Sequence, residues 1–182
     1  MKTVFSSHKQ LSETWAKQTQ SRGKSSNMFF ENEVIYSYGY HYEIAHFIDA
    51  PNGQKVCFIN SNGFSSSTSK HTNHVWQSIP KDILTFYVPF TIDGGYWYKN
   101  QWLSVENLPK IINKMMECID TLISKQLTAR TNSHYFGQAY NQYAKVLHIC
   151  ELFNFENPVL PQNWFEAENK SNSISYKMAQ VN

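Results

Sequence analysis

The chain has 182 residues, a mass of 21.2 kDa and a formal net charge of +2. This length is typical of one domain and is sufficient to bury a hydrophobic core without disulfides or metals. The weak positive charge argues against a protein that imitates the phosphate backbone of DNA, because such a mimic is strongly acidic. It also falls short of the basic stripe that is typical of a strong nucleic-acid binder.

The first predicted element is a short helix over residues 7–20. Ser7 is suited to its N-cap, and Leu11 and Trp15 lie on one face at helical spacing. Gly23 and the serines that follow it predict the end of this segment.

A run of β-prone segments follows this helix. The segments cover residues 27–30, 34–38, 40–48 and 55–60. Asn52-Gly53 separates the last two, and this dipeptide is a strong hairpin signal because both residues tolerate positive φ. These segments predict four strands in meander order.

The next segments combine helical and extended patterns. A helix is predicted over residues 70–79, and Pro80 ends it. Residues 83–90 predict another strand, followed by a turn at residues 93–95 and an aromatic ribbon over residues 96–103.

The second half of the chain has a helical pattern. Apolar residues follow one face over residues 108–123 and another over residues 135–153, and the polar segment 128–133 separates them. This pattern predicts an antiparallel helical hairpin. The fold class is therefore α+β, with an N-terminal antiparallel β-meander and short helices, followed by a C-terminal helical hairpin.

These segments predict a single α+β domain over residues 1–167. It would consist of a β-rich module over about residues 21–103 and a helical hairpin over about residues 104–155. Residues 168–182 are polar and lack periodicity, so we expect a flexible tail there.

The cysteines indicate a reducing compartment. Cys57, Cys118 and Cys150 are widely spaced, and each lies in an apolar stretch, so we expect buried thiols. The N-terminus has no apolar segment typical of a signal peptide, and no apolar run reaches the roughly 20 residues that span a bilayer. We therefore expect a cytoplasmic protein with no membrane partner.

Four histidines within residues 41–74 are candidate metal ligands: His41, His46, His71 and His74. His71 and His74 are three residues apart, which places both imidazoles on one side of a helix. His41 and His46 are an odd number of residues apart, so they point to opposite faces of a regular strand. Surface or capping histidines explain this pattern better than a zinc site, and neither a metal nor another cofactor is predicted.

An enzymatic interpretation needs an acid, a base and groups that hold phosphate. His41 and His71, with Thr68 and Lys70, are of the right types for a histidine-dependent phosphodiesterase or nuclease. However, the chain lacks clustered carboxylates of the kind that bind catalytic Mg²⁺, and it lacks the common motifs of nucleotide-dependent enzymes and hydrolases. No catalytic residue is predicted, and we expect a protein that binds without turnover.

Binding is better supported by the residue types. The segment 65–74 offers hydroxyls and a lysine at the start of a helix, which suits a phosphate or carboxylate, although an N-cap and a solvated loop explain this segment better when it is taken alone. The candidate binding residues are Arg22, Lys24, His41, Ser67, Thr68, Lys70 and His71. A set of alternating tyrosines forms one face, either a core layer or a contact surface, if Gly39 introduces no bulge. These tyrosines are Tyr36, Tyr38, Tyr40 and Tyr42.

Three short runs carry a resemblance to a known group. They resemble an uncharacterised domain that recurs in phages and bacterial mobile elements, and they are Asn27-x-Phe29-Phe30, Ile35-Tyr36-Ser37-Tyr38-Gly39-x-His41-x-x-Ile44-Ala45 and Ser67-Thr68-Ser69-Lys70-His71. The match covers roughly residues 21–80. In length, composition and the combination of a β module with a helical part, the chain is also similar to the type II-A anti-CRISPR inhibitors.

This resemblance implies an inhibitor that binds a type II CRISPR effector nuclease with its guide RNA, in the cytoplasm of a bacterial host cell. Contact with double-stranded DNA and formation of a homodimer stay open. The alternatives are a phage DNA-binding accessory protein, with Arg22, Lys24, Lys55 and Lys70 as phosphate contacts, and the histidine-dependent nuclease described above.

Overall fold

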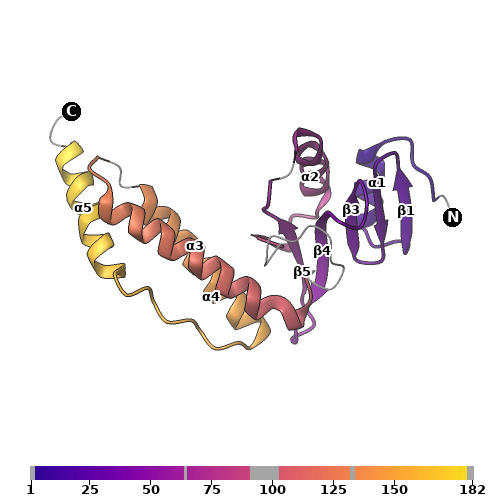
Figure 1. The fold of residues 1–182 in the computed structure, drawn as a ribbon. Helices are drawn as coiled ribbons and strands as arrows, with labels where there is room; N and C mark the ends of the chain where they lie inside the picture. The colour runs from indigo at the N-terminus through magenta and orange to yellow at the C-terminus, as the bar shows by residue number, and fades with distance from the viewer. Residues whose placement is uncertain (1–2, 64, 91–102, 132–133, 180–182) are drawn as a thin grey trace. The chain divides into compact units, whose positions relative to one another are not determined.

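The structure is a computed structural model that describes residues 3–63, 65–90, 103–131 and 134–179 (Figure 1). The chain divides into two compact units, residues 1–111 and 112–182, which are described separately. The first unit contains a sheet with covering helices, and the second is helical, so the predicted α+β class is confirmed. The aromatic ribbon expected over residues 96–103 lies outside the described residues, except for Leu103.

Within the described residues, six strands form one sheet in the order in which they occur along the chain. The strands are β1 (Arg22–Ser25), β2 (Met28–Glu31), β3 (Val34–Ser37), β4 (Glu43–Asp49), β5 (Lys55–Asn60) and β6 (Leu84–Val88). Neighbours from β1 to β5 are antiparallel, and β6 is parallel to β5. The predicted four-stranded meander is confirmed as β2 to β5.

The edge strand β1 lies where the sequence predicts only the end of a helical segment. Its second residue is Gly23, and a glycine inside a strand normally weakens it. A Cβ at Gly23 would lie 2.6 Å from the ring of Phe30 and 2.8 Å from the ring of Phe5. These aromatic rings occupy the space of the missing side chain, so tertiary packing favours a strand that local propensity does not predict.

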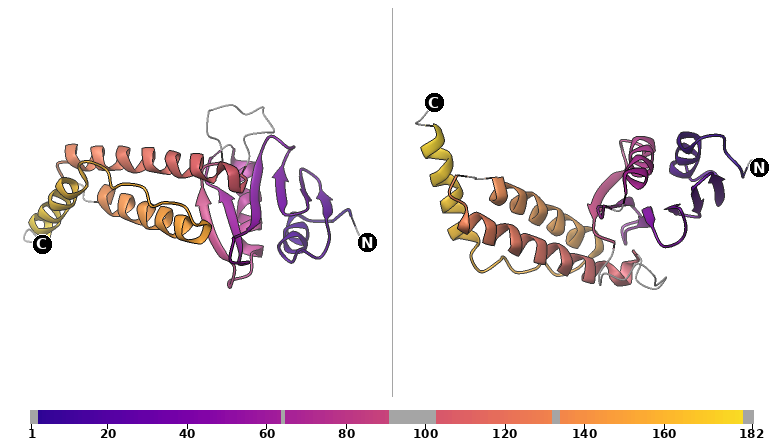
Figure 2. Two further views of the ribbon diagram at one scale, coloured as in Figure 1. Left: turned by 90° about the horizontal axis from the view of Figure 1, so that it is seen from below. Right: turned by 45° about the horizontal axis from the view of Figure 1, so that its top comes forward.

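Helices α1 (His8–Ala16) and α2 (Ser66–Ser78) cover one face of the sheet (Figure 2). Ser7 is the N-cap of α1, as predicted, and its hydroxyl accepts a hydrogen bond from the backbone N–H of Gln10. Helix α1 ends earlier than predicted, because Gln18 takes a φ of 50°. Helix α2 begins earlier than predicted, because Ser65 caps it.

The core of the first unit lies between the sheet and these helices. Its buried residues include Leu11, Trp15, Met28, Phe30, Ile35, Ile44, Phe47, Ile59 and Val75. The ring of Trp15 packs against that of Phe47 with centroids 4.6 Å apart, and its Nε1 donates to the carbonyl oxygen of Glu33 at 3.0 Å. This hydrogen bond satisfies the polar atom of a fully buried indole.

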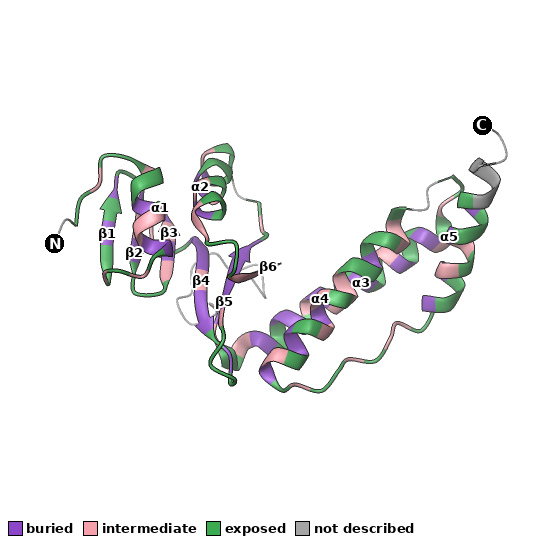
Figure 3. Cartoon of the chain, turned by 180° about the vertical axis from the view of Figure 1, so that it is seen from behind, coloured by how far each residue is buried: buried purple, intermediate pink, exposed green. Residues whose placement is uncertain are grey.

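The second unit consists largely of helices. A 3-10 turn (Val105–Asn107) precedes α3 (Leu108–Thr128), in which the boundary between the units falls, and α4 (His134–Phe153) and α5 (Trp164–Ala179) follow. Helices α3 and α4 lie side by side as the predicted hairpin, with buried and exposed residues interspersed along both (Figure 3). Helix α5 follows this hairpin as a third helix of the second unit.

Helix α5 lies where a flexible tail was expected from residue 168, so the structure differs from that expectation. Among the residues 164–175, whose burial is described, the buried ones are Trp164, Ala167, Ser171 and Ile174, which repeat at intervals of three or four residues. Lys170 also donates a hydrogen bond to the carbonyl oxygen of Leu127, at the end of α3. This buried face of α5 is hard to recognise in the sequence because one of its positions, Ser171, is polar.

The cysteine prediction is correct at Cys57 and Cys150, which are buried, and wrong at Cys118, which is exposed on α3. Ile119, the next residue, belongs to the buried stripe, and Cys118 lies off that stripe. Within the part of the chain that the structure describes, no helix is both long enough and apolar enough to cross a membrane.

Candidate functional site

The alternation of side chains on β1 places its cations on one face of the sheet. Arg22 and Lys24 are exposed, whereas Gly23 is buried toward the core. Arg22 lies directly opposite Glu31 on β2, and Lys24 lies opposite Phe29. Residues paired in this way share a face, so all four lie on the face opposite α1 and α2.

Aromatic side chains continue this face onto β3. Tyr36 lies opposite Phe29, and their rings stack with centroids 4.9 Å apart. Tyr40, from the turn after β3, meets both rings edge-on at 5.0 and 5.2 Å. Its hydroxyl donates to Oε1 of Glu31 at 2.5 Å, and this hydrogen bond raises the pKa of Tyr40.

We call these residues together the aromatic–basic face, which comprises Arg22, Lys24, Phe29, Glu31, Tyr36 and Tyr40. A pocket of about 470 Å³ opens beside them. Its walls come from β1, β2, Tyr40 and the N-terminal residues Thr3 and Val4. Val4 forms a parallel bridge with Lys24, which holds the N-terminal segment along the edge of β1. The face therefore combines two cations, one carboxylate and aromatic rings around a cavity.

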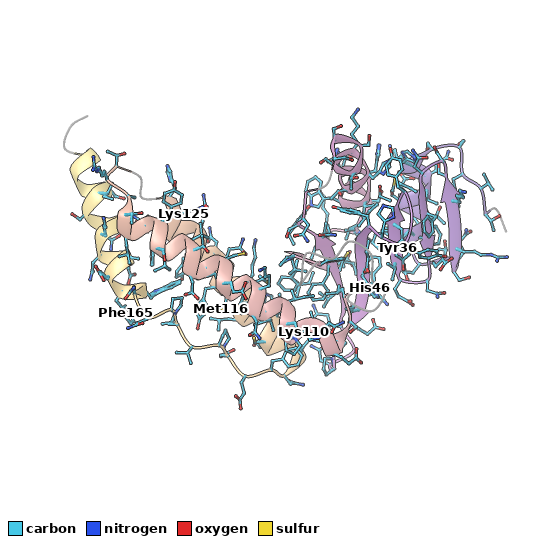
Figure 4. All side chains as sticks on the ribbon, in the orientation of Figure 1. Tyr36, His46, Lys110, Met116, Lys125 and Phe165 are labelled. Atoms are coloured by element: carbon cyan, nitrogen blue, oxygen red, sulfur yellow. The ribbon has the colours of Figure 1, made fainter. Side chains whose placement is uncertain are left out.

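A buried carboxylate lies beside a partly exposed imidazole farther along the sheet. Oε1 of Glu43 is 2.9 Å from Nδ1 of His46, and the Glu43 side chain is 3% exposed. Burial raises the pKa of Glu43, and the neighbouring imidazole partly opposes that rise. Glu43 is paired with Tyr36 across a β-bulge, and burial together with the Glu43 charge raises the pKa of Tyr36. Tyr36 and His46 are labelled on their neighbouring strands in Figure 4.

A second group of ionisable residues lies on the helix side of the sheet. The rings of His8 and His71 meet at 4.6 Å, and those of His8 and His74 at 6.1 Å. We call these three residues the histidine cluster. Nδ1 of His71 is 2.7 Å from Oγ of Ser37, and the ring of Tyr38 lies 5.5 Å from that of His71.

Electrostatics disfavour protonation of the histidine cluster. Burial, with help from His8 and His74, lowers the pKa of His71 to about 4. Burial and His74 also lower the pKa of His8, although a hydrogen bond to the backbone of Ser25 partly opposes this. Among the described residues, no three histidines, cysteines or carboxylates are placed so that they could hold a metal ion.

The structure separates the predicted binding residues into groups. Arg22 and Lys24 come together on the aromatic–basic face, and His41 is exposed in the turn between β3 and β4. Thr68 and His71 are buried on α2, on the opposite side of the sheet.

The remaining members of the predicted set also lie on α2. Ser67 is half-buried and Lys70 is exposed. The N-cap of this helix is occupied by Ser65, whose Oγ lies 2.9 Å from that of Thr68. The hydroxyls of this segment thus serve largely to cap α2.

The predicted tyrosine face does not form as one surface. Tyr38 takes a φ of 61°, which breaks the alternation at the end of β3. Tyr36 and Tyr40 join the aromatic–basic face, whereas Tyr38 contacts His71 and Tyr42 is buried in the core. The hydroxyl of Tyr42 donates to the carbonyl oxygen of Asn62.

Several functional candidates were not predicted from the sequence. Phe29 and Glu31 join the site because β1 pairs with β2, and this pairing depends on a strand that Gly23 obscures. His8 joins His71 only through the packing of α1 against α2. The sequence does contain one sign of β1: the charged residues Arg22 and Lys24 alternate with Gly23, as polar and buried positions do in a strand.

Comparison with known protein families, with curated proteins and with solved structures finds no match for this chain.

Proposed function

We propose that this protein binds nucleic acid through the aromatic–basic face. The observation that carries the proposal is the position of Arg22 and Lys24 beside Phe29 and Tyr40, around one pocket. Cations of this kind contact phosphates, and aromatic rings stack on bases. Tyr40 is 40% exposed, so part of its surface is available for contact.

The position of the histidine cluster supports binding without catalysis. Ser37 and His71 form a hydrogen-bonded pair of the type that activates a nucleophile. However, Ser37 is 1% exposed and His71 is 4% exposed, so a substrate would not reach the hydroxyl. This pair fixes α2 to β3.

The residues of the resemblance also meet at this hydrogen bond. Ser37 belongs to the Tyr-Ser-Tyr-Gly-x-His run, and His71 ends the Ser-Thr-Ser-Lys-His run. These two runs therefore belong to the scaffold of the first unit, whereas Arg22, Lys24 and Glu31 of the aromatic–basic face lie outside the runs that carry the resemblance. The resemblance supports a shared fold with mobile-element proteins more directly than it supports a shared partner.

In that context, the proposed target is the nucleic acid of a type II RNA-guided effector nuclease, which the protein would inhibit in a bacterial host cell. Charge alone supports only moderate affinity, because the net charge of the chain is +2. A ribonucleoprotein offers both a phosphate backbone and a protein surface, so a small aromatic–basic face would contribute part of a larger interface.

The first experiment measures binding to a fluorescein-labelled DNA strand and to its duplex by anisotropy over a range of salt concentrations. We expect the Arg22→Ala/Lys24→Ala variant to bind roughly ten-fold more weakly or worse, with a salt slope lower by about 1 for each lost phosphate contact. Lys81→Ala, which removes an exposed lysine outside the aromatic–basic face, is the matched control and should bind like the wild type. Absence of wild-type binding to both probes at low salt would refute the proposal.

A second experiment tests the biological target. The protein is added to a guide-loaded type II effector, and DNA cleavage and co-purification are measured. Inhibition by the wild type that Arg22→Ala/Lys24→Ala weakens would support the anti-CRISPR function. Nucleic-acid binding without any effect on the effector would instead favour a phage DNA-binding accessory protein.

A further inference from the structure

We infer that the pocket of the aromatic–basic face receives an unpaired base, so that the protein selects single-stranded nucleic acid over duplex. This inference rests on the proposed function and specifies its ligand. The pocket volume of about 470 Å³ falls within the range of cavities that hold small molecules. A base inside a duplex is stacked on both sides and cannot enter such a cavity without being extruded.

The aromatic rings suit a base that is already unstacked. Phe29 and Tyr40 line the pocket, and the ring of Tyr36 stacks on Phe29 from the neighbouring strand. The hydrogen bond from Tyr40 to Glu31 fixes the orientation of the phenol ring before any ligand arrives. A pre-oriented ring loses little conformational entropy on binding.

The charges of the pocket suit a phosphate backbone that runs along β1. Arg22 and Lys24 are two residues apart on one strand, a separation of roughly 7 Å, so they can contact successive phosphates of a single strand. Glu31 lies opposite Arg22 on the same face. Its carboxylate repels a phosphate backbone that crosses the face.

The same carboxylate favours an unpaired base. A carboxylate accepts hydrogen bonds and donates none when ionised. The amino and imino donors on the Watson–Crick edge of a base are engaged in a duplex and become available only when the base is unpaired. Glu31 therefore favours a base whose Watson–Crick edge is free to donate a hydrogen bond.

The test uses the full chain at one ionic strength and three probes of equal length: a 12-nucleotide DNA single strand, its duplex, and a strand with abasic sites at every internal position. The abasic strand keeps the phosphates and lacks the bases. We expect the intact single strand to bind about ten-fold more tightly than either other probe. Tyr40→Leu should abolish this preference while leaving binding of the abasic strand unchanged.

Trp76→Leu is the matched control, because Trp76 is an aromatic residue of the same unit that is 53% exposed on α2. It should keep the wild-type preference. Duplex or abasic binding as tight as that of the intact single strand would overturn the inference while leaving the proposed function standing. Failure of the wild type to bind any probe would overturn the proposed function itself. If Tyr40→Leu does not fold, the comparison of the three probes on the wild type still decides the question.

Discussion

Oγ of Ser37 lies 2.7 Å from Nδ1 of His71, and this hydrogen bond joins the last residue of β3 to α2 across 34 positions of the chain. Both side chains are buried, and the ring of His71 also contacts His8 of α1. The contact therefore connects the sheet with both of the helices that cover it.

Replacement of Ser37 by alanine should lower the free energy of unfolding by about 1–3 kcal/mol, because Nδ1 of His71 would be left buried without its partner. Urea denaturation followed by circular dichroism measures this difference. Ser69→Ala is the control, since Ser69 lies exposed on α2 and donates to the carbonyl oxygen of Ser65. Equal midpoints for the Ser37→Ala variant and the wild type would contradict the role of this hydrogen bond.

The histidine cluster predicts a loss of stability in acid. The folded pKa of His71 is about 4, below its ordinary value of 6.5. Between these two pH values the unfolded chain binds more protons than the folded chain. The contribution of His71 to the free energy of unfolding is therefore fully present above pH 6.5 and is lost as the pH decreases toward 4. One group contributes at most about 1.4 kcal/mol per pH unit.

The measurement is the free energy of unfolding between pH 7.5 and 4.5, for the wild type and for His71→Gln. The variant should show a shallower dependence on pH. Glu43 acts in the opposite direction, because its raised pKa favours the protonated folded state in mild acid. Since both proteins retain Glu43, the difference between their curves isolates His71, and parallel curves would refute the prediction.

Much of the sheet could be predicted from the sequence, because local signals agree with the tertiary fold there. Asn52-Gly53 marks the turn between β4 and β5, and Ser7 marks the start of α1. Strand β1 could not be predicted, because a glycine normally weakens a strand. Gly23 fits β1 because the rings of Phe5 and Phe30 occupy the space that its side chain would need. Helix α5 was missed for a related reason, since its buried stripe includes the polar Ser171.

Gly23→Ala should destabilise the protein by about 1–3 kcal/mol, because the new methyl group would meet the rings of Phe5 and Phe30. Gly63→Ala is the matched control: a Cβ at Gly63 meets nothing within 4 Å. We expect its effect to be within about 0.5 kcal/mol. Thermal unfolding compares the two variants directly, and similar melting temperatures would show that the packing around Gly23 is loose.

Ile174→Asp should release α5 from the second unit, because a charged group would replace a buried apolar one. Hydrogen exchange measures this as lost protection of the amides in residues 164–179. Asn172→Asp places the same charge at an exposed position and should leave the protection intact. Rapid exchange of these amides in the wild type would instead support the flexible tail that the sequence predicts from residue 168.

The candidate site could be predicted only in part. Arg22 and Lys24 were identified by their charge, and charge is visible in the sequence. Their neighbours are set by strand register: Phe29 and Glu31 face the cations because β1 pairs with β2 in one particular alignment. Tyr36 and Tyr40 meet because the chain turns at Tyr38, where a φ of 61° redirects the side chains that follow.

The order of the strands also has a kinetic consequence. From β1 to β5, each strand pairs with the next along the chain through a short connection, so little chain entropy is lost when each pair closes. Strand β6 reaches β5 in parallel only after the whole of α2 has crossed over. Because distant contacts slow folding, we expect the meander to assemble first and the docking of α2 and β6 to complete the sheet.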